Sequence, residues 1–252
     1  MVDDFSQQPL VADGAMVIRN HQRLGYGESC NVGCKQAKRD WLLLIADDIV
    51  PSPGMASFVD EIIPKLEAQD VIGFRIVGSN TMGSNTVSLY RDTVFSRMLD
   101  ILFGIDISRH SGPSRFVSGA MIFSSEFFTL LGGFDSRTYG GNGFREESDL
   151  QWRARKMGGR LMYIEDPFFQ HLNVPGGYQK VRSENEFYYM RNQTIFALRT
   201  SPIASPVLIA GFGAWLLARG LPIPILVRGV ARGLAVVVSG ITRETRDLSK
   251  TR

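Results

Sequence analysis

Two adjacent carboxylates, Asp47 and Asp48, follow the apolar run LLLIA at residues 42–46. Adjacent aspartates at a strand end often only cap the next helix or face water. Carboxylate oxygens also suit Mg²⁺ and Mn²⁺, which usually complete their coordination with substrate phosphates. Ligands of open α/β sheets bind outside the carboxyl ends of the strands, where this pair is expected. The pair alone is compatible with both interpretations.

Three further groups of residues could join these aspartates in one site. Acidic residues in the first turn of a helix usually compensate the helix dipole, and a lone histidine after a strand is more often structural. Carboxylates and an imidazole gathered at strand ends, however, can bind a nucleotide diphosphate through a metal and abstract a proton nearby. The groups are Asp3 with Asp4, the helix-start residues Glu146, Glu147 and Asp149, and His171.

Strands and helices alternate along the part of the chain that must position these residues. The continuous apolar run at 41–46 is typical of a central parallel strand covered on both faces. Pro64 is expected to kink or shorten the helix in which it lies. The alternation predicts an α/β fold with a mainly parallel sheet flanked by helices. The predicted strands cover 15–20, 41–46, 71–77 and 115–124, with short candidates at 161–165 and 167–171, and the predicted helices cover 25–38, 55–69, 91–103, 125–131, 146–158 and 184–200.

Composition limits the class of protein. A chain of 252 residues with 44% apolar and 21% charged residues is expected to form one compact domain, alone or with an appendage. Two cysteines, Cys30 and Cys34, are too few for a disulfide framework, and their spacing fits packing within a helix. The three histidines show no recognisable zinc spacing.

Basic residues concentrate in a C-terminal tail, residues 201–252. The tail holds seven Lys or Arg and two acidic residues, a net charge of +5, so residues 1–200 sum to −2. A main domain without a basic face argues against nucleic acid as a partner. Residues 201–218 carry no charge, and arginines then separate further apolar segments.

Two interpretations of this tail stay open. Arginines between apolar segments fit helices lying in the interface of an anionic leaflet, with at most one inserted segment. An ordinary helical hairpin packed on the domain is the other interpretation. We favour the first, and so expect a catalytic or binding domain at 1–200 and a membrane-associated tail at 201–252, at the cytoplasmic face of a membrane.

Five segments, spanning Val2 to about Arg199, resemble motifs of the inverting family 2 glycosyltransferases of GT-A fold, of bacterial or archaeal type. Each is short, but they occur in the family's order. They are VDDFS, similar to "VDDgS"; LGYGESCNVGCKQAKRDWLLLIADDIVP, similar to "G...a.N.g...A.gd.ilflDDDv.p"; FVSGAMIFSSEFFTLLGGFD, similar to "GA...r...f..iGgFDe"; EESDLQWRARKMG, similar to "EDvDL..R.r..G"; and FYYMRN, similar to "yy..RN".

The resemblance implies a function and a role for each candidate residue. The chain would move a sugar from a nucleotide-diphosphate donor to a saccharide or lipid-linked acceptor with inversion, in cell-surface glycan synthesis. Glu147 would deprotonate the acceptor hydroxyl, with Glu146 and Asp149 in acceptor or supporting roles. Asp48 and His171 would bind Mg²⁺ or Mn²⁺. The donor-binding residues would be Asp3, Asp4, Asn31, Asp47, Gly119 and Ala120.

The chain also departs from the family pattern. Ala46 replaces the first of three family aspartates, and Glu147 replaces the usual aspartate with a longer arm for the same acid–base chemistry. The motifs begin at the second family strand, and loss of the first would expose two unpaired sheet edges. An alternative function is therefore a noncatalytic nucleotide- or glycan-binding remnant, acting as a membrane-attached partner of an active enzyme.

Two other nucleotide-binding classes fit less well. Gly25 and Gly27 hint at the dinucleotide fingerprint G-x-G-x-x-G, but Cys30 occupies the third glycine position. The stretch also does not follow the first strand of a βαβ unit. A phosphate-binding P-loop is excluded because no G-x-x-x-x-G-K-[ST] occurs.

Overall fold

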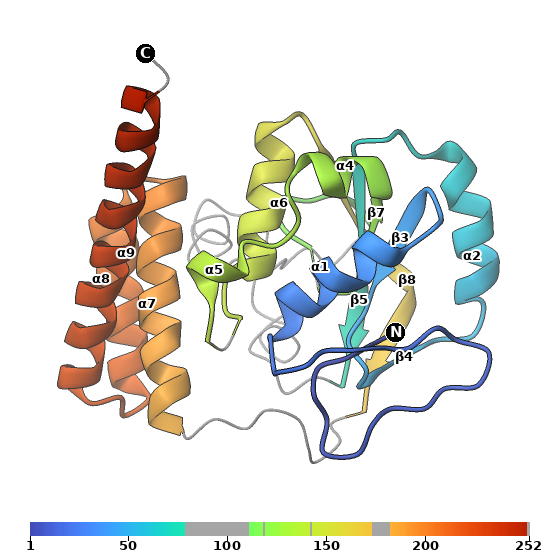
Figure 1. Cartoon of the computed structure of the whole chain (residues 1–252), viewed down its shortest axis with the longest axis horizontal. Coiled ribbons are helices and arrows are strands. Elements are labelled where there is room, and N and C mark those ends of the chain that lie inside the picture. Colours follow the sequence, from blue (N-terminus) through green and yellow to red (C-terminus); the bar gives the residue numbers. More distant parts are fainter. Residues whose placement is uncertain (79–110, 118, 142, 173–181, 251–252) are drawn as a thin grey trace. The chain divides into compact units, whose positions relative to one another are not determined.

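The computed structural model describes residues 1–78, 111–117, 119–141, 143–172 and 182–250, and within these the side chains of all but 182–185 and 241–250 (Figure 1). Contacts divide the chain into two compact units. The first comprises residues 1–135 and 146–177, and the second comprises 136–145 and 178–252. The predicted helix at 91–103 lies outside the described residues.

A six-stranded sheet forms the centre of the first unit. The order of five strands is β3 (Trp41–Leu44), β7 (Met121–Ser124), β5 (Asp70–Val77), β8 (Arg160–His171) and β4 (Ile49–Pro51), and β6 (Gly112–Pro113) also pairs with β8. A separate two-stranded parallel sheet joins β1 (Val2–Asp3) to β2 (Ile18–Arg19).

Strand directions correct the prediction of a mainly parallel sheet. Within the described six-stranded sheet, β5 and β8 form the parallel pair, while β7 is antiparallel to β3 and β5, and β4 is antiparallel to β8. It follows that β3, β5 and β8 run in one direction, as the strand–helix alternation predicted. The alternation could not reveal that β7 inserts between β3 and β5 in the opposite direction.

The position of β3 is a second correction. Its apolar run predicted a central strand, but in the described part of the chain β3 pairs with β7 alone and lies at the sheet edge. Leu43 of β3 and Ile45 after it are each 41% exposed, so one side of the run is not covered as a central strand would be. A continuous apolar run shows that the side chains of a strand are hydrophobic. It does not show with how many strands that strand pairs.

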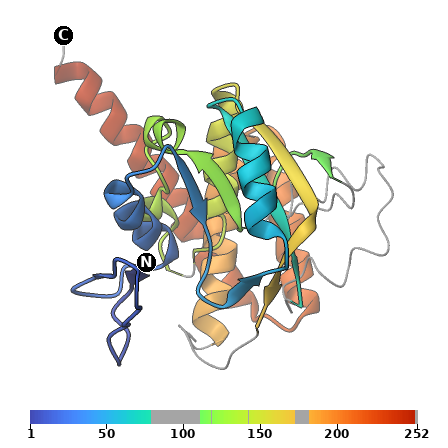
Figure 2. The ribbon, with the colours of Figure 1, turned by 90° about the vertical axis from the view of Figure 1, so that its right-hand side faces the viewer.

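Helices cover both faces of this sheet (Figures 1 and 2). The helices α1 (Tyr26–Gln36), α4 (Ser125–Leu130) and α6 (Glu146–Lys156) lie over one face, and α2 (Met55–Ile62) lies over the other. The α2 helix ends before Pro64, which sits in the 3₁₀ turn η1 (Ile63–Lys65), so the predicted shortening is confirmed. The predicted α/β class with flanking helices and an apolar helical tail is confirmed.

The second unit is a helical bundle of α7 (Arg182–Thr200), α8 (Ser205–Ala218) and α9 (Ile223–Lys250), with the short α5 (Ser136–Tyr139) and its loop. Asn192 of α7 donates to the carbonyls of Tyr139 and Phe144, at 2.9 and 3.0 Å. Because α7 packs with α8 and α9, contacts group it with the tail. The predicted domain boundary at residue 200 stays a prediction.

One helix in the described residues is long and apolar enough to cross a membrane. The 18-residue segment Ile223–Gly240 of α9 has a mean hydropathy of 1.6, and 17% of it is buried. The core helix of a soluble protein passes the same test of length and composition, so membrane association stays a prediction at this point.

Candidate active site

Five of the predicted site residues, Asp47, Asp48, Gly119, Ala120 and His171, lie at one end of the six-stranded sheet. Asp47 and Asp48 follow β3, and His171 ends β8, which runs in the same direction. The antiparallel β7 starts at this end, since Leu44 pairs with Met121. Backbone pairing therefore brings the residues before β7, Gly119 and Ala120, next to the aspartate pair.

Asp48 and His171 come together through the pairing of β4 with β8. Ile49 pairs with His171, and the Nε2 of His171 lies 3.2 Å from the Oδ2 of Asp48. The backbone N–H of Leu172 donates to the carbonyl of Asp48 at 2.8 Å, which fixes the strand end. Both side chains remain partly exposed, at 24% for His171 and 38% for Asp48, so both can be reached by a ligand.

This pair fits a divalent cation as a partial set of ligands. The described residues contain no group of three or more His, Cys, Asp or Glu side chains placed to hold a metal ion. One carboxylate and one imidazole suit an ion of the Mg²⁺ or Mn²⁺ type when phosphate oxygens and water supply the remaining positions. Asp47, the exposed neighbour, stands at the same turn.

Glu147 is packed against Gly119. A Cβ added at Gly119 would lie 2.4 Å from the Oε1 of Glu147, so any side chain at this position would collide with the carboxylate. Burial raises the pKa of Glu147 to about 7, because the low-polarity surroundings disfavour its charged form. A carboxyl group that titrates near neutral pH is suited to accept a proton from a substrate hydroxyl.

Tyr26, at the start of α1, is a site residue that the sequence did not single out. Its hydroxyl donates to the carbonyl of Gly119 at 3.3 Å, and its ring packs edge-on against Phe134. Burial and then the nearby charge of Glu147 raise the pKa of Tyr26 well above its usual value. The sequence signal for Tyr26 is its position between Gly25 and Gly27 at a helix start. That pattern suggests only a nucleotide-binding loop.

Glu146 and Asp149 are buried, and they hold neighbouring elements in place. The backbone N–H of Gly27 donates to the Oε2 of Glu146 at 3.2 Å. The Nε of Arg153 donates to Asp149 at 2.7 Å, and the same guanidinium binds backbone carbonyls that follow α4. Of the three acidic residues at this helix start, Glu147 is the one whose carboxylate meets Gly119.

The two N-terminal aspartates organise the backbone around them. Asp3 is buried and accepts hydrogen bonds from the backbone of Ser6 and Leu10 and from Arg19; the backbone bonds above all lower its pKa. Asp4 accepts from the backbone N–H groups of residues 24 and 25, at 2.7 and 2.8 Å. Burial opposes ionisation of Asp4, but these bonds outweigh it and its pKa is lowered.

Asn31 and Ala120 also contribute to the packing of the first unit. The side chain of Asn31 exchanges two hydrogen bonds with the backbone of Phe134, at 2.8 and 2.9 Å, and so ties α1 to the loop after α4. Ala120 is fully buried in the core beneath α2. The predicted donor-binding roles of these residues, and of Asp3 and Asp4, stay predictions.

Comparisons with known proteins found similarity to solved structures. No family model matches the chain, and no curated protein sequence matches it. Several solved structures match the chain over most of its length. They include GalNAc-T7 with UDP, GalNAc and Mn²⁺, S. aureus TarS 1–349, and the mannosyltransferase PcManGT from Pyrobaculum calidifontis with GDP-Man and Mn²⁺.

These similarities are partial. Sequence identities to the three are 18%, 14% and 16%, and each TM-score is 0.45. The matches cover 71%, 78% and 90% of this chain but 36%, 52% and 69% of the respective partners, so the chain spans about a third to a half of the first two. Residue roles must therefore come from the geometry of this chain.

Proposed function

We propose that this chain is a glycosyltransferase that moves a sugar from a nucleotide-diphosphate donor to a hydroxyl of a saccharide or glycolipid acceptor, with inversion. One observation carries the proposal. The carboxylate of Glu147, whose pKa is about 7, abuts Gly119 at the sheet end where Asp48 and His171 meet. A proton acceptor near neutral pH and a cation-binding pair then serve the same reaction.

The reaction is a direct displacement. The acceptor oxygen forms a bond to the anomeric carbon while the bond from that carbon to the donor phosphate oxygen breaks, which inverts the configuration. Glu147 takes the proton of the acceptor hydroxyl, and the nucleoside diphosphate leaves with the bonding electrons. Proton transfer to a positioned side chain contributes about 10²–10⁴-fold to the rate of such reactions.

Asp48 and His171 would hold the divalent cation, Mg²⁺ or Mn²⁺. The ion, when bound, supplies positive charge that stabilises the departing diphosphate. Asp47, exposed beside the pair, would face the ribose of the donor. The absence of side-chain atoms at Gly119 leaves room for Glu147 to approach the acceptor.

The tail supports a location at the cytoplasmic face of a membrane. Exposed apolar side chains lie on both α8 and α9, and exposed arginines follow α8 at Arg219 and lie on α9 at Arg228 and Arg232. Such a surface fits a peripheral helical pair on an anionic leaflet. The acceptor is then a lipid-linked saccharide or a growing surface glycan.

A noncatalytic nucleotide- or glycan-binding module is the second candidate. The observation that favours it is the engagement of Asp3, whose carboxylate accepts hydrogen bonds from Ser6, Leu10 and Arg19 of its own chain. A carboxylate used in this way offers little to a donor base or ribose. Such a module would bind at this sheet end and act with an active partner enzyme.

Thermal unfolding with UDP, GDP and dTDP, each with and without Mn²⁺, tests the donor site. Binding to the folded state at a hundredfold excess over Kd should raise the midpoint by about 5–10 °C. The shift should require Mn²⁺ and disappear in Asp48→Ala. Asp60→Ala, an exposed aspartate of α2, is the matched control and should keep the shift.

Glu147→Gln separates the two candidate functions. The enzyme should lose sugar transfer in this variant while keeping the Mn²⁺-dependent nucleotide shift, because the amide cannot accept the proton. Unchanged cellular activity of the variant would sink the catalytic assignment and leave the binding module. The absence of a nucleotide shift from a cooperatively folded sample would exclude donor binding and leave a noncatalytic remnant that binds glycan.

A further inference from the structure

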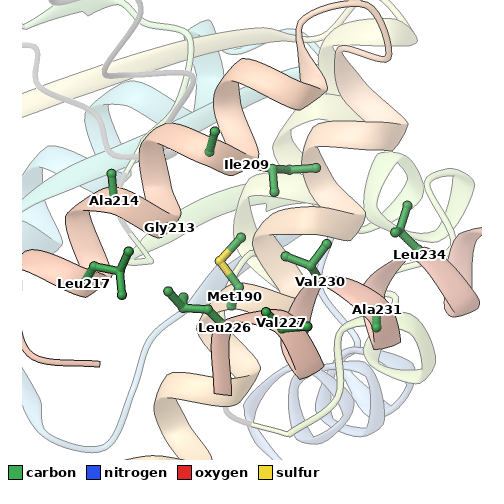
Figure 3. A pocket seen from close by; sticks show the side chains of 11 residues that line it. Met190, Ile209, Gly213, Ala214, Leu217, Leu226, Val227, Val230, Ala231 and Leu234 are labelled. Carbon is green, nitrogen blue, oxygen red and sulfur yellow. The ribbon is translucent and has the colours of Figure 1, made fainter. Parts of the chain in front are cut away.

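Helix α9 has an apolar face and a cationic flank. Its apolar face shares a groove of about 450 Å³ with α8 (Figure 3). The α9 side chains on this face are Leu226, Val227, Val230, Ala231 and Leu234. Arg228 and Arg232 do not line the groove, and both are exposed. Because residues four apart lie one above the other on a helix, these two arginines form a row on a different flank of α9.

The arginine row adjoins the contact between α9 and α7. A Cβ at Gly229 would lie 3.2 Å from the carbonyl oxygen of Phe187. A Cβ at Gly233 would lie 2.8 Å from the carbonyl oxygen of Arg191. Since each arginine of the row directly precedes one of these glycines, the row runs beside Phe187 and Arg191, which lie one turn apart on α7.

Aromatic side chains connect the row to the guanidinium of Arg191. The guanidinium of Arg228 lies 5.9 Å from the centre of the Phe187 ring, and that ring packs edge-on against Tyr188 at 5.2 Å. The guanidinium of Arg191 lies 6.0 Å from the centre of the Tyr188 ring. Burial lowers the pKa of Arg191 most, and the positive charge of Arg232 lowers it further, so these two guanidinium groups lie within electrostatic reach of each other. Arg191, Arg228 and Arg232 thus form one arginine cluster on the surface of α7 and α9.

Arg191 is held in place by the loop after α5. Its Nη1 donates to the Oδ1 of Asn192 at 2.6 Å and to the carbonyl of Gly140 at 3.5 Å. Asn192 is itself buried and donates to the carbonyls of Tyr139 and Phe144. Within the described residues, Nε and Nη2 of Arg191 donate no hydrogen bond. A fixed guanidinium with free donors loses little conformational entropy when an anion binds it.

Acidic side chains do not neutralise the arginine cluster. In the part of the chain that the structure describes, the ion pairs lie elsewhere, and no carboxylate pairs with any of the three arginines. Glu186 of α7 lies near Tyr189, whose pKa its charge helps burial to raise. Residues 201–243 contain four arginines and no aspartate or glutamate. Like charges gathered in this way repel one another, and a bound anion relieves that repulsion.

We propose that Arg191, Arg228 and Arg232 form a binding site for a phosphate group, carried either by a lipid headgroup or by a soluble phosphate compound. A guanidinium donates two parallel hydrogen bonds to a pair of phosphate oxygens. A phosphate monoester offers three acceptor oxygens and about −1.5 to −2 charge at pH 7, which suits several guanidinium groups at once. A carboxylate offers two oxygens and a single charge.

This site goes beyond the proposed function, because it requires neither donor, metal nor Glu147. It is also distinct from adsorption of the basic tail to an anionic leaflet. Adsorption depends on the total charge of the tail, so Arg219 contributes to it as the other arginines do. The phosphate site includes Arg191 of α7 and excludes Arg219, which follows α8 and lies over the ring of Trp215 at 4.2 Å.

Calorimetric titration of the full chain with dioctanoyl phosphatidic acid, kept below its micelle concentration, tests the site. A salt concentration of about 150 mM screens long-range attraction. We expect saturable binding of one molecule per chain. Arg228→Gln and Arg232→Gln should each weaken it at least about tenfold, since each removes hydrogen bonds to a charged group. Arg219→Gln is the matched control and should leave the affinity unchanged.

Arg191→Lys tests whether the planar guanidinium matters as well as its charge. Lysine keeps the positive charge but presents one ammonium group, so binding should again weaken. Thermal unfolding checks that this variant is folded. Arg228 and Arg232 are exposed, so their variants carry the test if Arg191→Lys misfolds. Asp48→Ala, which removes the proposed metal ligand, should bind phosphatidic acid as the wild type does.

Two further ligands identify what carries the phosphate. Dioctanoylglycerol lacks the phosphate group and should not bind. Inorganic phosphate that binds as tightly as phosphatidic acid would assign the site to soluble phosphate compounds. Much weaker binding of inorganic phosphate, still reduced by Arg228→Gln, would assign it to a lipid headgroup.

Three results would overturn the proposal. Equal losses of affinity in Arg219→Gln, Arg228→Gln and Arg232→Gln would show a general attraction to positive charge. Equal binding of dioctanoylglycerol and phosphatidic acid would show that the acyl chains bind to apolar surface and that the phosphate is not recognised. Absence of saturable phosphatidic acid binding to the folded wild-type chain would exclude the site.

Discussion

At the scale of single residues, the site depends on how Glu147 is accommodated. Its carboxylate sits against a glycine, and burial raises its pKa to about 7. A carboxyl group whose pKa is higher in the folded than in the unfolded chain favours folding most at low pH. That contribution is present below the ordinary pKa of about 4.5 and is lost as pH rises through 7.

Glu147→Gln should therefore change stability in a pH-dependent way. The amide carries no charge at any pH, so the variant avoids the cost of burying a carboxylate. At pH 8 its free energy of unfolding should exceed that of the wild type, by at most about 3 kcal/mol, and near pH 4.5 the two should be similar. Denaturant unfolding across this range measures the difference. A constant difference at all pH values would contradict the raised pKa.

Transfer by the wild type should rise with pH through about 7, because only the ionised Glu147 can accept the acceptor proton. Rates measured from pH 5 to 9 at saturating donor and metal give the profile. A rate that stays flat over this range would assign the base to another group. Glu147→Gln, measured in parallel, should be slower by about 10²–10⁴-fold and should show no such rise.

Gly119→Ala should displace the Glu147 carboxylate. The added Cβ would meet Oε1 at 2.4 Å, and the end of the glutamate side chain has to move. We expect transfer to fall by about 10²-fold with a small change in melting temperature, since a shift of about 1 Å can have that effect. In a Glu147→Gln background the same change should cost no further activity. Additive losses in the double variant would contradict a shared cause.

At the scale of elements, the packing of α9 on α7 depends on two glycines one helical turn apart. A Cβ at Gly229 would lie 2.8 Å from Met190, and one at Gly233 would lie 2.7 Å from Thr194 and 2.8 Å from the carbonyl of Arg191. Gly240 of α9 and Gly211 of α8 have no such neighbours within 4 Å. Glycine therefore allows α9 to approach α7 closely at Gly229 and Gly233, and has no such role at Gly211 and Gly240.

Alanine substitutions should separate these two classes of glycine. Gly233→Ala should destabilise the bundle by about 1–3 kcal/mol because a backbone carbonyl blocks the new methyl group. Gly211→Ala and Gly240→Ala should stabilise it by about 0.5–1 kcal/mol, since alanine is the better helix former. Thermal unfolding followed by circular dichroism distinguishes the outcomes. Similar effects at all three positions would contradict the tight α7–α9 contact.

At the scale of the whole molecule, charge and apolar surface are segregated along the chain. The tail carries +5 and residues 1–200 carry −2. We expect the full chain to bind vesicles that contain anionic phospholipid at low salt and to bind neutral vesicles much less. Each arginine near the surface contributes about 1 kcal/mol, and screening weakens this attraction.

Co-sedimentation with vesicles at 50 and 500 mM NaCl measures that dependence. Arg228→Gln combined with Arg232→Gln should lower the affinity about 25-fold at low salt. Asp60→Ala, which leaves the tail unchanged, should bind as the wild type does. Binding that is equal for neutral and anionic vesicles would show that charge does not direct the tail to membranes.

The sequence by itself determined the strands β3, β5, β7 and β8 with the helices α1, α2, α4, α6 and α7, the shortening of α2 at Pro64 and the basic apolar tail. These features depend on local patterns: apolar periodicity, proline geometry and the residue types that follow each strand. The candidate base and cation ligands follow from the family resemblance and stay predictions. The sequence also predicted a mainly parallel sheet with β3 at its centre, and both statements were wrong because strand pairing is not local.

Tertiary structure alone decided which of these residues meet. Pairing of β4 with β8 brought His171 to Asp48, and the start of α6 brought Glu147 to Gly119 and Tyr26. The start of α6 also buries Asp149, which forms an ion pair with Arg153. Glu147 and Asp149 nevertheless have similar neighbours in the sequence. Distances between segments far apart in the chain, and the burial that sets a pKa near 7, arise only when the sheet and helices are packed together.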